Sequence, residues 1–215
     1  MQIDIVSDTI CPWCFIGKRR LERALALRDD TEFNIQWRPY RLDAAIPKEG
    51  VDRRTYLRNK FGEGPDVAQR GEAIRELGER EGISFDFGRI AKTPNTTDSH
   101  RLIRWAGTTG VQDAVVEALF SGYFEQGRDI GDPSILEWIA AQCGMDSDLV
   151  GSLLAQDADI DLVEREDDLA HRMGINGVPT VIFANKYLVS GAQEPETIVR
   201  IIDKLNDEAS AAEDG

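Results

Sequence analysis

Two cysteines near the start of the chain have the spacing of a redox-active pair. Cys11 and Cys14 flank Pro12 and Trp13, and they follow a short apolar run at the predicted start of a helix. The nucleophile in disulfide exchange is the thiolate, and the unpaired N–H groups and dipole of a helix N-terminus favour that anion. Two intervening residues let the second sulfur resolve a mixed disulfide. We therefore predict that Cys11 attacks and that Cys14 is the less exposed resolving thiol.

Two other interpretations of the pair are weaker. A structural zinc site needs four ligands, and the remaining candidates, Cys143, His100 and His171, are isolated in the sequence, so no metal is predicted. A permanent disulfide would close a loop too short to stabilise the fold much. Cys143 lies near the end of an apolar helical pattern and is predicted to be a buried apolar side chain rather than a third redox thiol.

A second motif lies far along the chain, where residues 174–180 read Gly-Ile-Asn-Gly-Val-Pro-Thr before a β-rich stretch. The two motifs in this order favour thiol–disulfide exchange over structural cysteines. Strands are predicted at residues 3–7, 33–38, 180–183 and 187–190. Helices are predicted at residues 12–28, 52–61, 65–80, 97–107, 111–124, 133–143 and 147–156, and from residue 195 onward. The pattern is a β-α-β unit, a helical block over residues 42–172, and a β-β-α end, which is an α/β fold.

Composition limits the classes of function. The chain has 215 residues and a formal net charge of −14, which argues against a nucleic-acid or anionic-membrane partner. No apolar run approaches a membrane span, and the start lacks the basic and apolar regions of a signal peptide, so a cytoplasmic location is expected. In that compartment paired thiols are more often catalytic than structural. Without a G-x-G-x-x-G or Walker-type loop, dinucleotide and phosphate sites have no support.

The ordered motifs resemble the DsbA-like branch of the thioredoxin superfamily, and within it the FrnE-type proteins. The matching segments are Asp8-Thr9-Ile10-Cys11-Pro12-Trp13-Cys14-Phe15-Ile16-Gly17, Pro94-Asn95, His100-Arg101-Leu102 and Ser190-Gly191-Ala192-Gln193. The resemblance implies a thioredoxin-like fold with a large all-helical insertion. It divides the chain into a thioredoxin-like domain (1–41 plus 173–207), an inserted helical domain (42–172) and a frayed acidic tail (208–215).

The resemblance also implies how a substrate is held. In the family the peptide bond before the proline that matches Pro179 is cis, and the backbone of Val178 then pairs with an extended chain whose disulfide lies over Cys11. An ordinary trans proline at the start of a strand is the alternative. Trp13 is expected to be an exposed aromatic that contacts the substrate.

Three further residues are candidates for support of the redox pair. Asp8 lies three residues before Cys11 and is either a proton acceptor or a cap near the helix. Asn95 and His100 resemble positions near the mouth of the cleft, with a histidine on the surface of a helix as the alternative for His100.

Two expectations concern packing. Trp37, Trp105 and Trp138 are predicted to lie in the core. The basic run at residues 18–20 is predicted to be a solvated face of the first helix.

The predicted function is a thiol–disulfide oxidoreductase that acts on protein or small-molecule thiols and disulfides. It needs no cofactor beyond the Cys11–Cys14 pair, with glutathione as a candidate co-substrate. One alternative is a glutathione-dependent isomerase or kappa-class glutathione transferase, in which a serine typically matches Cys11. The other is a non-enzymatic chaperone or binding module. The substrate, the direction of electron flow, and the choice between monomer and homodimer stay open.

Overall fold

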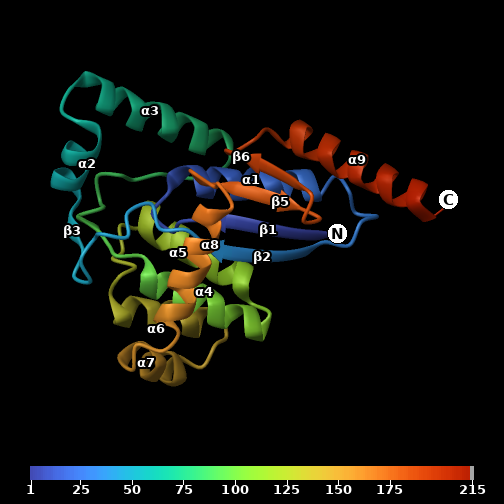
Figure 1. The fold of residues 1–215 in the computed structure, drawn as a ribbon. Helices are drawn as coiled ribbons and strands as arrows, with labels where there is room; N and C mark the ends of the chain where they lie inside the picture. The colour runs from blue at the N-terminus through green and yellow to red at the C-terminus, as the bar shows by residue number, and fades with distance from the viewer. Residues whose placement is uncertain (214–215) are drawn as a thin grey trace.

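A four-stranded mixed sheet lies at the centre of the computed structural model, which describes residues 1–213 (Figure 1). Its strands are β1 (Gln2–Ser7), β2 (Asn34–Pro39), β5 (Thr180–Phe183) and β6 (Tyr187–Ser190), in the order β2-β1-β5-β6. β1 pairs parallel with β2 and antiparallel with β5, and β5 pairs antiparallel with β6. Burial of β1 from Ile3 to Ser7 suits a central strand with both neighbours paired.

The first helix begins at the redox motif. α1 (Pro12–Leu25) has Cys11 at its N-cap and a proline at its first position, where the absent N–H would have had no partner. The helix was predicted to reach residue 28, but it ends three residues earlier, and Leu27 beyond it is exposed. α1 packs against α9 (Pro195–Glu213), the last helix of the chain.

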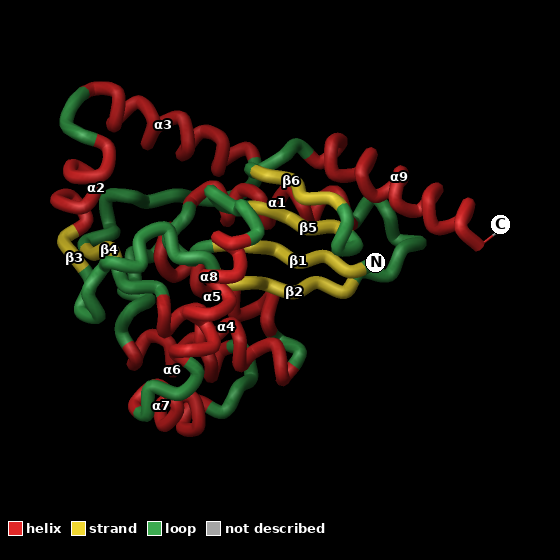
Figure 2. The backbone as a smooth tube through the Cα atoms, in the orientation of Figure 1, coloured by secondary structure: helices red, strands yellow, loops and turns green. Residues whose placement is uncertain are grey.

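The block between β2 and β5 is helical, with one small two-stranded sheet. Its helices are α2 (Arg53–Phe61), α3 (Pro65–Arg80), α4 (Thr97–Thr109), α5 (Gln112–Phe124), α6 (Pro133–Gln142), α7 (Ser147–Ala155) and α8 (Ile160–Arg172). The strands β3 (Val51–Asp52) and β4 (Lys92–Thr93) pair antiparallel at the base of the α2–α3 hairpin (Figure 2). α4, α5 and α8 all contact β2, so the helical block covers that edge of the sheet.

One apolar core joins the two parts. Phe15 of α1 stacks on Phe120 of α5 with a centroid distance of 5.2 Å, and Phe85 and Phe124 meet it as well. The same core continues through Ile3 to the sheet. The insertion therefore packs directly on the helix that carries the cysteines.

The mixed α/β fold with a helical insertion is confirmed, with several local differences. β3 and β4 were not predicted, because two-residue strands carry almost no periodic signal. α8 lies within the predicted helical block but was not predicted as a separate helix, although its buried positions Val163, Asp167 and Ala170 follow helical spacing. The tail that was expected to fray from residue 208 continues α9 to Glu213; residues 214–215 lie outside the described residues.

Two packing predictions were wrong. Trp138 is 41% exposed, because the buried stripe of α6 runs through Leu136, Ile139 and Ala140 instead. The guanidinium carbon of Arg128 lies over the Trp138 ring, 3.9 Å from its centroid.

The basic run on α1 is also not a solvated face throughout. Lys18 is buried and its Nζ donates to Asp113 at 3.0 Å, with Glu22 and Glu117 beside it. Arg20 is buried too, because Glu81 after α3 covers it. Glu22 lies one turn further along α1, but neighbouring elements supply Asp113, Glu117 and Glu81, so the spacing of α1 alone does not reveal those three.

Candidate functional site

The two cysteines lie where β1 ends and α1 begins. Cys11 is the N-cap of α1 in an extended conformation, and Cys14 lies in the first turn, with its N–H donating to the Cys11 carbonyl at 3.0 Å. Both are free thiols; Cys11 is 5% exposed and Cys14 is 1% exposed. The more accessible sulfur is thus the one at the helix end, where backbone N–H groups favour a thiolate.

The environment of Cys14 keeps it protonated. Burial raises its pKa well above the ordinary value, and a hydrogen bond with Cys11 and the charge of that neighbour act in the same direction. Contacts with the Ser7 side chain and the Asp8 backbone lower the pKa but are smaller effects. Of the two sulfurs, that of Cys14 is therefore the one that its surroundings hold as a thiol.

The second motif faces the first. The Val178–Pro179 peptide bond is cis, and the Cys11 thiol donates to the Val178 carbonyl oxygen at a sulfur–oxygen distance of 3.6 Å. Pro179 is buried and Val178 is half-buried. The Thr180 hydroxyl donates to the Gly177 carbonyl at 2.8 Å and braces the loop. Segments 167 residues apart are thus in direct contact.

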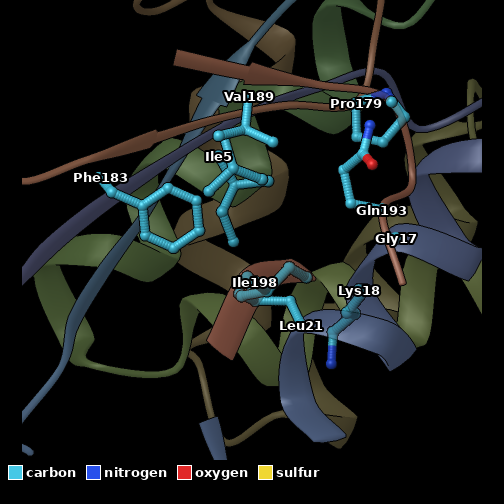
Figure 3. A pocket seen from close by; sticks show the side chains of 11 residues that line it. Ile5, Gly17, Lys18, Leu21, Pro179, Phe183, Val189, Gln193 and Ile198 are labelled. Atoms are coloured by element: carbon cyan, nitrogen blue, oxygen red, sulfur yellow. The ribbon is translucent and has the colours of Figure 1, made fainter. Parts of the chain in front are cut away.

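A glycine that the sequence analysis quoted without a role lets α1 approach this loop. A Cβ on Gly17 would lie 2.9 Å from Pro179 Cγ and 3.6 Å from the Ala192 Cβ. Figure 3 shows Gly17 and Pro179 on one side of an apolar hollow, with Ile5 and Phe183 on the other. The volume of this hollow is about 10 Å³, the size of one water at most. The hollow therefore has no room for a substrate.

Asp8 and His100 form a buried pair that joins β1 to the insertion. His100 was compared with a histidine on a helix surface, but it is 3% exposed, because this face of α4 packs against the segment after β1. Asp8 Oδ2 accepts from the Leu42 N–H at 2.7 Å, whereas Oδ1 lies 3.5 Å from His100 Nε2. Neither Asp8 Oδ1 nor His100 Nε2 has a hydrogen-bond partner among the described residues. Such buried orphan atoms are rare in folded proteins and often mark functional groups.

A neighbouring contact, which the sequence analysis missed, ties the same segments together. The buried hydroxyls of Thr9 and Ser99 are 2.8 Å apart, and the Ser99 hydroxyl donates to the Thr96 carbonyl. Thr9 lies two residues before Cys11, but two hydroxyl residues 90 positions apart give no sequence signal that they meet.

The remaining site predictions, for Trp13 and Asn95, have different outcomes. Trp13 is 39% exposed between the two cysteines, which makes it available to a visiting molecule. Asn95 has a different environment: its amide donates to the Ile46 carbonyl at 2.6 Å and accepts from the Thr97 N–H at 2.9 Å. Both polar atoms of Asn95 are thus used to hold the start of α4.

Among the side chains that the structure describes, which leave out residues 65–67 and 212–215, no group of three or more His, Cys, Asp or Glu residues is arranged to hold a metal ion. Within the described part of the chain, no helix has both the length and the apolar character to cross a membrane.

Comparisons with known proteins agree with this geometry. Residues 2–203 match the DSBA-like thioredoxin domain family. A probable DsbA oxidoreductase from Streptomyces coelicolor is 31% identical, with a TM-score of 0.86 over 95% of this chain and 89% of that one. A 2-hydroxychromene-2-carboxylate isomerase is 16% identical (TM-score 0.71; 99% of both chains). The cytosolic disulfide reductase DsbM of Pseudomonas aeruginosa, in a structure with GSH, is 15% identical (TM-score 0.66; 96% of this chain and 100% of that one).

Proposed function

Because this chain belongs to the DSBA-like thioredoxin domain family, we propose that it is a thiol–disulfide oxidoreductase that uses Cys11 as nucleophile and Cys14 as resolving thiol. The observation that carries the proposal is the contact between the Cys11 sulfur and the Val178 carbonyl before Pro179, at the N-terminus of α1. It brings a helix-activated sulfur against a loop with backbone groups that an extended substrate can pair with.

The exchange has two balanced steps. The Cys11 thiolate attacks one sulfur of a substrate disulfide, forms a mixed disulfide, and releases the other substrate sulfur as a thiolate. Cys14 then loses its proton and attacks Cys11, which forms the Cys11–Cys14 disulfide and releases the second substrate thiolate. The substrate gains two electrons and the protein loses two; the proton that Cys11 lost before its attack and the proton that Cys14 loses are both available to protonate the two released substrate thiolates. The reverse sequence oxidises a dithiol.

The substrate lies across Cys11 in this proposal, between Trp13 and the Val178–Pro179 loop. Loss of the Cys11 proton removes the donor that the Val178 carbonyl has in the free protein. That carbonyl is then available to accept a backbone N–H from the substrate, so activation of the sulfur and binding of the chain are coupled.

Asp8 and His100 take the proton of Cys14 in the second step. Cys14 must lose a proton that its burial holds tightly, so an acceptor nearby is needed. Asp8 contacts Cys14 through its backbone, and its Oδ1 faces His100 Nε2 with no other partner.

Insulin reduction with dithiothreitol tests the proposal. Wild type is expected to accelerate the reaction, Cys11→Ser to abolish the acceleration, and Cys143→Ser, a matched loss of one thiol away from the loop, to retain it. Equal turnover by wild type and Cys11→Ser would refute the proposal. If both cysteines were idle in a chaperone, Cys11→Ser/Cys14→Ser would suppress aggregation as well as wild type does.

Glutathione is the second candidate, as a co-substrate or as the substrate of an isomerase. The DsbM structure with GSH and the isomerase fold support it. Glutathione-dependent conjugation or isomerisation that survives Cys11→Ser would favour the isomerase. A glutathione requirement that disappears with Cys11 would favour exchange. The cytoplasm, where DsbM acts, is the proposed compartment.

A further inference from the structure

Helix α2 concentrates positive charge in an acidic chain. The whole chain carries 25 basic and 39 acidic residues, whereas α2 reads Arg-Arg-Thr-Tyr-Leu-Arg-Asn-Lys-Phe, with four basic residues and no acidic one. Because no residue of α2 is buried, packing in the core does not account for its concentration of basic residues.

The side of α2 that faces the body accounts for two of the four cations. Arg53 donates to the Tyr123 hydroxyl at 2.9 Å and lies over the Phe87 ring. Lys60 donates to the Leu42 carbonyl at 3.4 Å, and also to the hydroxyl of Tyr56 one turn earlier in α2. The contacts of Arg53 and Lys60 with other segments attach the helix to the body, while the bond from the Thr55 N–H to Asp52 caps its start.

The outer side of α2 carries the other two cations beside an exposed aromatic ring. Arg54, Arg58 and Phe61 follow the i, i+4, i+7 spacing of a single stripe, and all three are exposed. Arg58 Nη1 lies 3.6 Å from Glu63, a loose surface contact, and no ion pair of Arg54 is present among the side chains that the structure describes. Arg58 lies in the last turn, where a cation suits the end of the helix, but Arg54 lies in the first turn, where it does not, and two like charges one turn apart repel each other. We call Arg54, Arg58 and Phe61 the outer stripe.

The helix lies at the redox end of the molecule. Figure 1 shows α2 beyond the end of the sheet at which β1 finishes, opposite the N-terminus. A short chain of hydrogen bonds links the two places: Lys60 reaches the Leu42 carbonyl at 3.4 Å, the Leu42 N–H reaches Asp8, and the Asp8 carbonyl accepts from the Cys11 N–H. A protein partner covers about 800 Å² on each side, so one whose sulfur meets Cys11 extends well beyond the loop.

We propose that the outer stripe of α2 selects protein substrates whose cysteine is flanked by acidic residues. The inference deepens the proposed function and depends on it for the exchange step. Carboxylates on the partner complement Arg54 and Arg58, while Phe61 supplies apolar contact area. The stripe lies on an exposed helix face and not in a concavity, so it suits a protein segment better than a small anion. Acidic side chains on the neighbouring α3, such as Glu72 and Glu76, disfavour a large polyanion such as nucleic acid.

The test compares two cysteine peptides that differ only in their flanks, Glu in one and Gln in the other. We expect kcat/KM for exchange to favour the Glu peptide roughly five- to tenfold at low salt and to equalise at about 0.5 M salt. Arg54→Gln/Arg58→Gln should bring the ratio within about twofold, and Arg54→Glu/Arg58→Glu should invert it. Arg54→Lys/Arg58→Lys should preserve it.

The control removes the same kind of charge elsewhere. Arg75 on α3 is already paired with Glu72 and Glu79, so Arg75→Gln should leave the peptide ratio unchanged. A wild-type ratio near one, or a ratio unaffected by the double glutamine variant, would overturn the inference.

A second measurement separates this inference from the proposed function. Binding of serine versions of both peptides to Cys11→Ser, followed by fluorescence anisotropy, requires no electron transfer. The Glu version should bind more tightly, and Arg54→Gln/Arg58→Gln should abolish that difference. If the preference in binding persists while no exchange occurs, the surface stands and the redox function fails. Equal binding of the two serine peptides would overturn the inference whatever the exchange assay gives.

Discussion

Replacement of Gly17 by alanine isolates the contact between α1 and the Pro179 loop. The added Cβ would lie 2.9 Å from Pro179 Cγ and 3.5 Å from Pro179 Cβ. The proline ring is tied to the backbone at both ends, so the contact is relieved only by movement of the loop or of α1. The loop carries the Val178 carbonyl that faces Cys11, so relief of the contact displaces one wall of the site.

Two opposing terms set the change in stability. Overpacking in a close-packed region costs about 1–3 kcal/mol, whereas alanine is favoured over glycine in a helix by about 1 kcal/mol. The free energy of unfolding should therefore fall by about 0–2 kcal/mol. Activity should suffer more than stability, because misplacement of reacting groups by as little as 1 Å can lower rates by up to about 100-fold; we expect a decrease of roughly tenfold in kcat/KM.

Gly71 on α3 supplies the matched control. A Cβ there meets nothing within 4 Å, so Gly71→Ala should stabilise the protein by about 1 kcal/mol and leave exchange unchanged. Urea unfolding and insulin reduction measured on both variants separate the terms. If Gly17→Ala gained as much stability as Gly71→Ala and exchanged disulfides at the wild-type rate, the contact with Pro179 would have no role in the site.

Two further predictions concern protons. Burial is the main cause of the raised pKa of Cys14, so the folded reduced protein keeps a proton that the unfolded chain loses at high pH. The free energy of unfolding should therefore fall as the pH rises above about 8.5, and urea titrations of Cys14→Ala should show a smaller fall. Identical pH slopes for the two proteins would contradict the burial argument. Asp8→Asn keeps an oxygen for the Leu42 N–H but removes the acceptor that faces His100. Stopped-flow kinetics should show that resolution of the mixed disulfide slows roughly tenfold or more, while its formation is unchanged. Equal slowing of both steps would indicate a structural role for Asp8 instead.

Features that depend on local patterns were predictable from the sequence. The cysteine spacing, the proline after Cys11 and the apolar runs of β1 and β5 each specify a nearby conformation. The helices that were predicted match those of the structure closely. The burial of individual polar side chains was less predictable from the sequence. His100 and Lys18 belong to residue types that are usually exposed, and they are buried because distant segments supply Asp8, Asp113 and Glu117 as partners.

The same limit applies to the seam between the two parts of the chain. A helical insertion could have been a separate lid, joined to the sheet only at its ends. Instead, α4 supplies His100 to Asp8 and Ser99 to Thr9, on the two residues that lead from β1 towards Cys11. The segment that leads into Cys11 is therefore held from the sheet on one side and from the insertion on the other. It follows that substitutions in α4 should alter the redox chemistry without touching either sulfur, and that the insertion is part of the site and not only a cover over it.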